Sequence, residues 1–118
     1  MKRIAIVGNR TGWKKSEVET VLLRLLNSHD DIVISGGASG VDTYAIDFAK
    51  EIGLQTIVIK PDSKLPSPKR YFDRNYKIAN LCDILVAFNK KRISGTKNTI
   101  NHAKRLYKSV IVINDVKA

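Results

Sequence analysis

Cysteine and histidine are almost absent from this chain. Among its 118 residues there is one cysteine, Cys82, and there are two histidines, His29 and His102. A lone cysteine cannot form an internal disulfide, which excludes a disulfide-stabilised domain and favours the reducing cytoplasm. Because Cys82 lies in an apolar context, we expect it to be a buried hydrophobic residue. The histidines have no cysteine or carboxylate at ligand spacing, so no metal site is predicted.

Long apolar runs are also missing. No stretch approaches the roughly 20 residues of a membrane-spanning helix, so we expect no membrane contact. The apolar run near the amino terminus is about four residues, shorter than the roughly 7–15 of a signal peptide, and indicates a first strand. The few prolines fall together at Pro61, Pro66 and Pro68 and mark one long, irregular connection. The composition is 43% hydrophobic and 27% charged, as in a globular protein, and 1–118 fits one domain.

Acidic residues are scarce beside basic ones. The 21 Lys and Arg against 11 Asp and Glu leave a net charge of +10. Such an excess favours nucleic acid or nucleotides as partners, although lysine-rich surfaces also serve solubility. The densest basic cluster is Lys90-Lys91-Arg92. The region before it adds Lys60, Lys64, Lys69, Arg70 and Arg74.

Short apolar runs alternate with helical patterns along the chain. The runs are rich in β-branched residues and nearly continuous in apolar character, which is typical of parallel strands covered on both faces. They predict strands at 3–7, 32–35, 55–59, 84–88 and 110–113. Apolar residues at helical spacing predict helices at 17–26, 43–52, 70–81 and 97–106. Ser16 is the expected cap of the first helix, and Gly53 is expected to end the second.

This alternation predicts an α/β fold: a single Rossmann-like domain with a five-stranded parallel sheet and helices on both faces. With right-handed crossovers the strand order is 3-2-1-4-5 or 2-1-3-4-5, and we favour 3-2-1-4-5. Ligands then bind in the crevice between the first and fourth strands, at the carboxyl ends of the strands. The segments that leave these ends are 8–10, 35–37 and 89–96.

The turn after the second predicted strand is the most informative segment. It is Ser35-Gly36-Gly37-Ala38-Ser39-Gly40-Val41-Asp42 and leads into a helix. Its glycines allow a positive φ or a close approach of ligand to backbone, and the amino end of a helix attracts anions. The spacing matches neither the Rossmann GxGxxG nor the P-loop. Ser35 and Ser39 are either turn hydroxyls or ligand donors. Asp42 either caps or braces this region, which we favour, or binds a ribose hydroxyl.

Two more turns, at 8–10 and 94–96, are expected at the same crevice. Ser94-Gly95-Thr96 precedes a helix, where Ser94 or Thr96 either caps the helix or helps to hold a second anionic group. Arg10 is the best candidate for a bidentate contact to phosphate, the alternative being a surface arginine. Trp13 either stacks on a base or covers the core, and the sequence favours neither. The convergence of these turns predicts a nucleotide or sugar-phosphate ligand.

Taken together, these segments resemble the SLOG superfamily, a Rossmann-like group that includes the DprA, YpsA and LOG (lysine-decarboxylase-like) proteins. Gly8-Asn9-Arg10 is similar to the family's G-S-R turn, with Asn9 in place of serine, and 35–42 looks like its S-G-G-A-x-G-x-D motif. Arg74-Asn75, 82–88 and Ser94-Gly95-Thr96 resemble its R-N, D-x-[LIV]-x-A-[FW] and S-G-T elements, in the expected order. The resemblance implies the 3-2-1-4-5 sheet and a pocket for a nucleotide or nucleotide-derived ligand.

The resemblance does not decide the activity, since the superfamily includes hydrolases, ligand sensors and DNA-binding recombination mediators. The hydrolase branch carries P-G-G-x-G-T-x-x-E, but the matching position here is Thr99, and no acid occurs between Asp83 and Asp115. N-glycosidic hydrolysis is therefore the least favoured function, and no catalytic residue is assigned. We expect a sensor or carrier of a nucleotide-derived ligand, or alternatively a DprA-like binder of single-stranded nucleic acid.

No cofactor is identified beyond this nucleotide-like ligand, and the resembled families imply a homodimer. Against nucleic acid, the loops offer few aromatic residues for base stacking beyond Trp13, Tyr71 and Phe72. The residues expected to bind the ligand are Gly8, Asn9, Arg10, Ser35, Gly36, Gly37, Ser39, Gly40, Asp42, Arg74, Asn75, Ser94, Gly95 and Thr96.

Overall fold

The computed structural model describes residues 1–90 and 94–116. They hold a parallel sheet in the order β3-β2-β1-β4-β5, which confirms the predicted Rossmann-like α/β fold and its 3-2-1-4-5 order. The strands are β1 (Arg3–Gly8), β2 (Ile32–Ser35), β3 (Gln55–Val58), β4 (Ile84–Phe88) and β5 (Ser109–Ile113). The helices are α1 (Lys15–Leu25), α2 (Val41–Glu51), α3 (Lys69–Leu81) and α4 (Gly95–Arg105). All of these bounds lie within two residues of the predicted ones.

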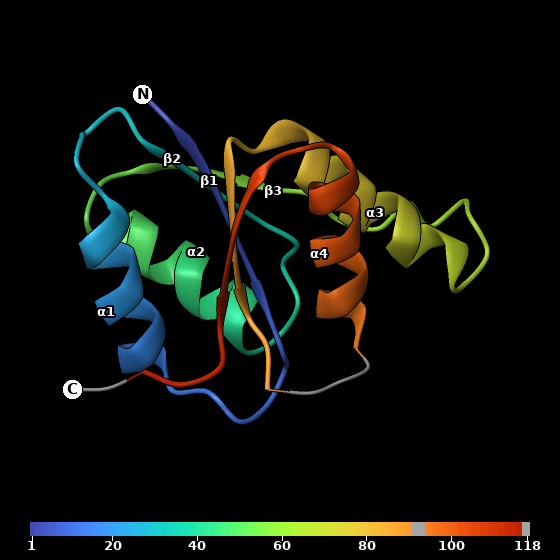
Figure 1. Ribbon diagram of the computed structural model, residues 1–118, viewed down its shortest axis with the longest axis horizontal. Helices are drawn as coiled ribbons and strands as arrows, with labels where there is room; N and C mark the ends of the chain where they lie inside the picture. Colours follow the sequence, from blue (N-terminus) through green and yellow to red (C-terminus); the bar gives the residue numbers. More distant parts are fainter. Residues whose placement is uncertain (91–93, 117–118) are drawn as a thin grey trace.

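Helices cover both faces of the sheet, α1 and α2 on one side and α3 and α4 on the other (Figure 1). Successive residues of β1 serve the two faces alternately: Ile4 and Ile6 belong to the core under α1 and α2, and Ala5 and Val7 to the core under α3 and α4. Cys82 is fully buried in the second core, as predicted. Burial on both faces is the reason that the strands are almost continuously apolar.

The ends of two helices test the capping predictions. Helix α1 begins after Lys14, whose backbone N–H donates to Oε1 of Glu17 at 2.8 Å. The prediction that Ser16 caps this helix is therefore wrong, because Glu17 satisfies the donor at the helix start and Ser16 lies within the first turn. Gly53 follows α2 with a φ of 81°, the left-handed conformation that ends helices at glycine.

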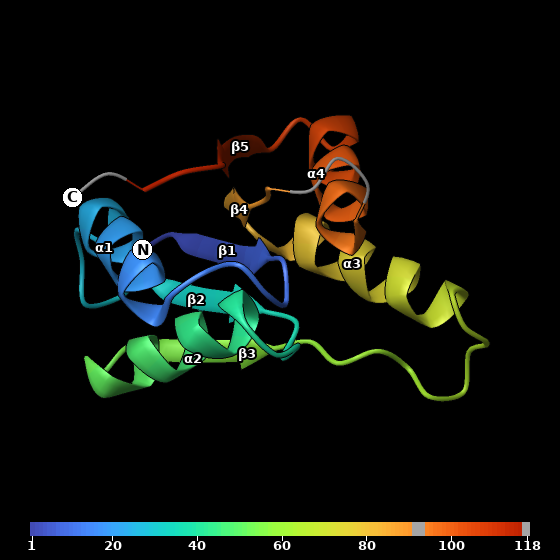
Figure 2. The ribbon, with the colours of Figure 1, turned by 90° about the horizontal axis from the view of Figure 1, so that it is seen from below.

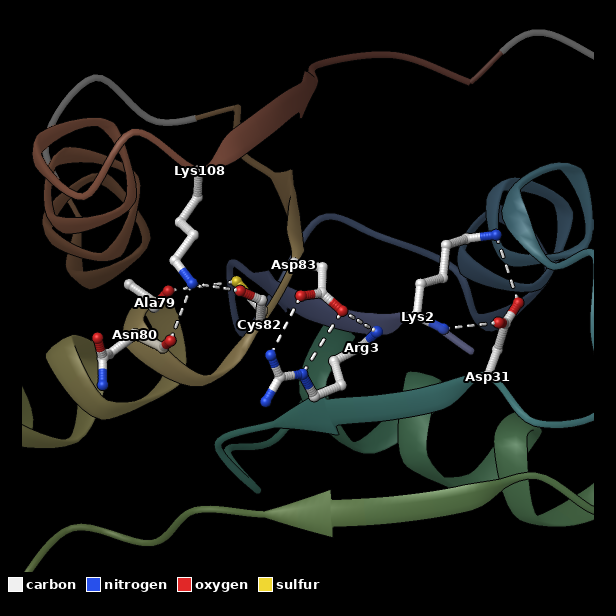
Figure 3. Close-up of polar contacts among 8 residues, drawn as sticks. All are labelled: Lys2, Arg3, Asp31, Ala79, Asn80, Cys82, Asp83 and Lys108. Carbon is white, nitrogen blue, oxygen red and sulfur yellow. Dashed lines mark hydrogen bonds and ion pairs between the residues drawn. The ribbon is translucent and has the colours of Figure 1, made fainter.

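Ion pairs and helix-end hydrogen bonds join the elements at the amino ends of the strands (Figure 3). Asp31, which precedes β2, accepts the backbone N–H of Lys2 at 3.0 Å and lies 3.3 Å from its ammonium group. Asp83, which precedes β4, accepts the backbone N–H of Arg3 at 2.8 Å and its guanidinium at 3.2 Å. Lys108, which precedes β5, donates to carbonyl groups at the end of α3. These contacts stabilise the amino ends of the strands, which lie opposite the predicted site.

None of the helices in the described ranges has the length and apolar character that a membrane crossing requires.

Candidate functional site

A cleft of about 330 Å³ opens at the carboxyl ends of β1 and β4, in the crevice predicted from the strand order. Its walls come from the end of β1, the start of α2, one face of α3 and the start of α4. The predicted ligand residues that line it are Gly8, Asn9, Arg10, Asp42, Arg74, Asn75, Ser94, Gly95 and Thr96. The fold therefore brings the turns at 8–10 and 94–96 together with α3 around one cavity.

A second hollow of about 360 Å³ adjoins the cleft. The two share four lining residues, Arg10, Ala38, Tyr71 and Arg74, so these side chains stand between them. The segment after β3 runs out past the first turn of α3 (Figure 2) and supplies the far wall. The predicted residues Gly36 and Gly37 line this hollow and not the cleft.

The remaining predicted residues, Ser35, Ser39 and Gly40, line neither hollow. Ser35 is buried, and its hydroxyl donates to the carbonyl of Ile6 at 2.6 Å. The structure thus places Ser35 in a role that joins β2 to β1, and not as a ligand donor. Gly40 has a φ of 81°, and a Cβ there would collide with the backbone of Arg10. Glycine at this position therefore lets α2 begin directly against the turn that carries Arg10.

Asp42 is an almost fully buried acid, with 4% of its surface exposed. Its Oδ2 accepts the backbone N–H of Ala38 at 3.4 Å, and the backbone of Gly36 also hydrogen-bonds to the carboxylate. Burial raises the pKa of Asp42 to about 6, against the hydrogen bond from Ala38 and the positive charge of Arg74, which lower it. Gly40 occupies the cap position of α2, and Asp42 lies inside the first turn of the helix. Its carboxylate therefore braces the 36–38 turn and does not cap the helix.

Arg74 is braced between the glycine turn and its own helix. Its Nη1 donates to the carbonyl of Gly36 at 3.0 Å, and its Nε donates to Oδ1 of Asn75 at 2.9 Å. Burial lowers the pKa of the guanidinium, and the carboxylate of Asp42 partly offsets that effect. The buried Asn75 in turn donates to Oδ1 of Asn98 in α4 at 3.0 Å. Arg74 therefore presents a positioned cation at the junction of the two hollows.

An amide network joins the turn after β1 to the start of α4. The buried Asn9 donates from Nδ2 to Oδ1 of Asn89 at 3.0 Å and accepts the backbone N–H of Lys90 at 2.9 Å. The hydroxyl of Ser94 donates to the same Oδ1 at 3.1 Å and accepts the backbone N–H of Lys97 at 3.2 Å. Ser94 is thus the cap of α4, and Asn9 holds the loop that leads to this cap.

Trp13 belongs to the core. Only 7% of it is exposed, and its ring meets Phe88 edge-on with centroids 5.1 Å apart. The ammonium of Lys90 lies 4.1 Å from the centroid of the indole ring and donates to the carbonyl of Gly12 at 2.6 Å. Of the two predicted roles of Trp13, the structure supports covering the core, because the ring is too buried to stack on a base. The ammonium of Lys90 is therefore held against Trp13 and Gly12. This corrects the prediction that Lys90 belongs to a basic cluster with the two residues that follow it.

The cations that line the two hollows are Arg10, Lys60, Arg70 and Arg74. Lys91 and Arg92, the rest of the predicted cluster, lie outside the described residues. In the described ranges, no three residues among His, Cys, Asp and Glu are grouped so that they could hold a metal ion.

One face of α3 contributes more to the cleft than the sequence motifs indicated. Tyr71 and Ile78 line it together with Arg74 and Asn75, as does Phe72. Positions 71, 74, 75 and 78 have the spacing of one helix face, so the R-N motif extended by one turn each way would have found Tyr71 and Ile78. Tyr71 is 38% exposed and Phe72 47%, so both rings are partly accessible beside the cations.

The fold and the cleft define a Rossmann-like domain of the SLOG type. A sequence model of one family within that group, described as DNA recombination-mediator protein A, matches residues 1–64. The chain belongs to this family, the DNA recombination-mediator protein A family. No curated protein matches the chain.

Solved structures share the fold. DNA processing protein A (DprA) from Streptococcus pneumoniae is 24% identical, with a TM-score of 0.79 over 97% of this chain and 50% of that chain. DNA processing protein A from Helicobacter pylori, described for its single-stranded DNA binding mode, is 21% identical, with a TM-score of 0.79 over 98% and 68%. The protein TM1055 is 23% identical, with a TM-score of 0.76 over 100% and 77%. This chain thus spans half the length of the pneumococcal protein, and at these identities the likeness is one of fold.

Proposed function

We propose that this chain binds single-stranded nucleic acid in the groove made by the cleft and the adjoining hollow. The observation that carries the proposal is the set of cations along this groove. Arg10 and Arg74 stand where the two hollows meet, and Lys60 and Arg70 line the second one. A guanidinium group matches phosphate bidentately, and several cations along one groove suit a backbone with repeated phosphates.

Aromatic side chains in the groove support the same proposal. Tyr71 and Phe72 line the cleft with partly exposed rings. Stacking on such rings tolerates any base, whereas the neighbouring cations hold the backbone. Membership of a recombination-mediator family agrees with this function, as does the fold shared with a Helicobacter pylori protein described for single-stranded DNA binding.

A second candidate is a single nucleotide or nucleotide-derived ligand, with the chain acting as a sensor or carrier. The volume of the cleft favours it, because about 330 Å³ falls within the range of small-molecule sites. The first turns of α2 and α4 border the cleft through Asp42 and Thr96, and the amino ends of helices attract phosphate.

Titration of fluorescent oligothymidylate with the purified chain separates the two candidates. We expect a strand of about four nucleotides to bind at low salt. Arg10→Gln should weaken this binding roughly tenfold, the scale of one charged hydrogen bond, and lower the slope of log K against log salt by about 0.7. Arg24→Gln removes the same charge from an exposed position on α1 and should change neither value.

Calorimetry with nucleoside monophosphates completes the experiment. Binding of a mononucleotide without binding of the oligonucleotide would replace the first candidate by the second. If wild-type protein binds neither at about 50 mM salt, both proposals fail.

A further inference from the structure

The positive charge of the chain is concentrated in its second half. Residues 1–58 contain seven Lys or Arg and seven Asp or Glu, whereas residues 59–118 contain fourteen Lys or Arg and four Asp or Glu. The first half forms β1, α1, β2, α2 and β3, and the second half forms α3, β4, α4 and β5. Lys91, Arg92 and Lys117 lie outside the described residues. Of the eleven other cations of the second half, seven belong to α3 or α4, which cover one side of the sheet.

Helix α4 carries an outer face that is basic at both ends. Lys97, Lys104 and Arg105 are exposed, and their spacing puts them on one face of the helix. The opposite face, which includes Thr99, Ile100 and Ala103, is buried. Helix α4 contains no acid, and within the described residues no ion pair involves any of the three cations.

Helix stability explains only part of this pattern. Cations in the last turn interact favourably with the helix dipole, which accounts for Lys104 and Arg105. Lys97 lies in the first turn, where a cation is unfavourable and where no acid balances it. The cation at that position lies next to the cleft-lining residue Thr96 and is available to an external anion.

An exposed tyrosine follows the carboxyl end of α4. Tyr107 is 97% exposed and has a φ of 58°, a conformation that favours glycine. Its backbone N–H donates to the carbonyl of Lys104 at 3.1 Å, and the neighbouring Lys108 donates to the carbonyls of Asn80 and Cys82 at 3.0 and 2.8 Å. The ring is thus presented to solvent on an anchored turn, beside Lys104 and Arg105.

We propose that the outer face of α4, ending at Tyr107, is a second contact surface for single-stranded nucleic acid that leaves the groove. This inference rests on the proposed function. Helix α4 begins at the cleft and runs antiparallel to β4 towards the amino ends of the strands (Figure 1). The helix is about 16 Å long. The strand's phosphates contact Lys97, Lys104 and Arg105, and a base stacks on Tyr107. A membrane surface fits less well, because the exposed positions of α4 carry no apolar side chain to insert.

Two oligothymidylates, of about four and about sixteen nucleotides, test the proposal. The triple substitution Lys97→Gln, Lys104→Gln, Arg105→Gln should weaken binding of the long strand at least tenfold, lower its salt slope by about 2 and leave the short strand unchanged. The matched control is Lys14→Gln, Arg24→Gln, Lys50→Gln, which removes the same charge from exposed positions of the α1 and α2 side. It should affect neither strand.

Tyr107→Asn tests the stacking contact without risk to folding. Asparagine tolerates the left-handed conformation better than tyrosine, so the free energy of unfolding should stay the same or rise. Affinity for the long strand should still fall about tenfold.

The outcomes separate this inference from the proposed function. If the short strand binds and the triple variant binds the long strand as wild type does, the α4 surface is refuted and the groove stands. Equal weakening of both strands also refutes it. The inference would also be refuted if the triple substitution weakened binding to vesicles that contain phosphatidylserine and left the binding of both strands unchanged. That result would assign the face to a membrane. If wild-type protein binds neither strand, the proposed function fails first.

Discussion

Replacing Asp42 by asparagine should change how the stability of this protein depends on pH. Burial raises the pKa of Asp42 from 3.8 to about 6, so the folded chain binds this proton more tightly than the unfolded chain. The contribution of Asp42 to stability is therefore complete below pH 3.8 and is lost as the pH rises through 6. The full shift corresponds to about 3 kcal/mol, of which about 1.4 kcal/mol falls between pH 5 and pH 7.5.

Asp42→Asn stays neutral and lacks this loss. The difference in free energy of unfolding, variant minus wild type, should thus rise by about 1.4 kcal/mol from pH 5 to pH 7.5. Urea titrations followed by the fluorescence of Trp13, the only tryptophan, measure it directly. Asp47→Asn removes an exposed acid from the same helix and controls for the change in net charge. A difference between Asp42→Asn and wild type that stays constant over this range would refute the assignment of a raised pKa to Asp42.

The remaining predictions concern the turns around the cleft. Gly40→Ala should lower the free energy of unfolding by at least 2 kcal/mol, roughly twice the cost of Gly53→Ala, because both have a φ of 81° but only at Gly40 would a Cβ meet backbone. Equal costs in urea titrations would contradict the collision with Arg10. Lys90→Ala should cost about 1 kcal/mol and shift the emission of Trp13 to longer wavelength, because the ring loses its cation. An unchanged emission spectrum would show that Lys90 does not cover the ring.

The sheet was predictable because its signals are local. Each strand is a short apolar run. The alternation of strands and helices left two strand orders open, and the favoured one, 3-2-1-4-5, is the observed one. Helix starts were predicted less accurately than strands. The predicted cap of α1 was wrong because the backbone N–H of Lys14 donates to Glu17, so the helix begins before Ser16.

Side-chain roles in the site depended on partners that are distant in sequence. Asn9 donates to Asn89, 80 residues away, and no local pattern shows that pairing. Ser35 ends a strand, and only the register with β1 shows that its hydroxyl faces a carbonyl of the sheet. The glycine-rich turn and the R-N motif did identify the right neighbourhood, since both border the observed hollows. A homodimer, a cytoplasmic location and a single domain stay predictions of the sequence.

The unequal charge of the two halves of the chain has a consequence for how the molecule approaches a polyanion. A neutral first half and a strongly positive second half make the protein an electric dipole, and such a dipole rotates in the field of a charged strand before contact. Encounters should therefore be oriented as well as fast, with an association rate that falls steeply as salt is added. Molecules aligned in this way along one strand would turn α1 and α2 outward, so the neutral face would form the outer surface of the assembly.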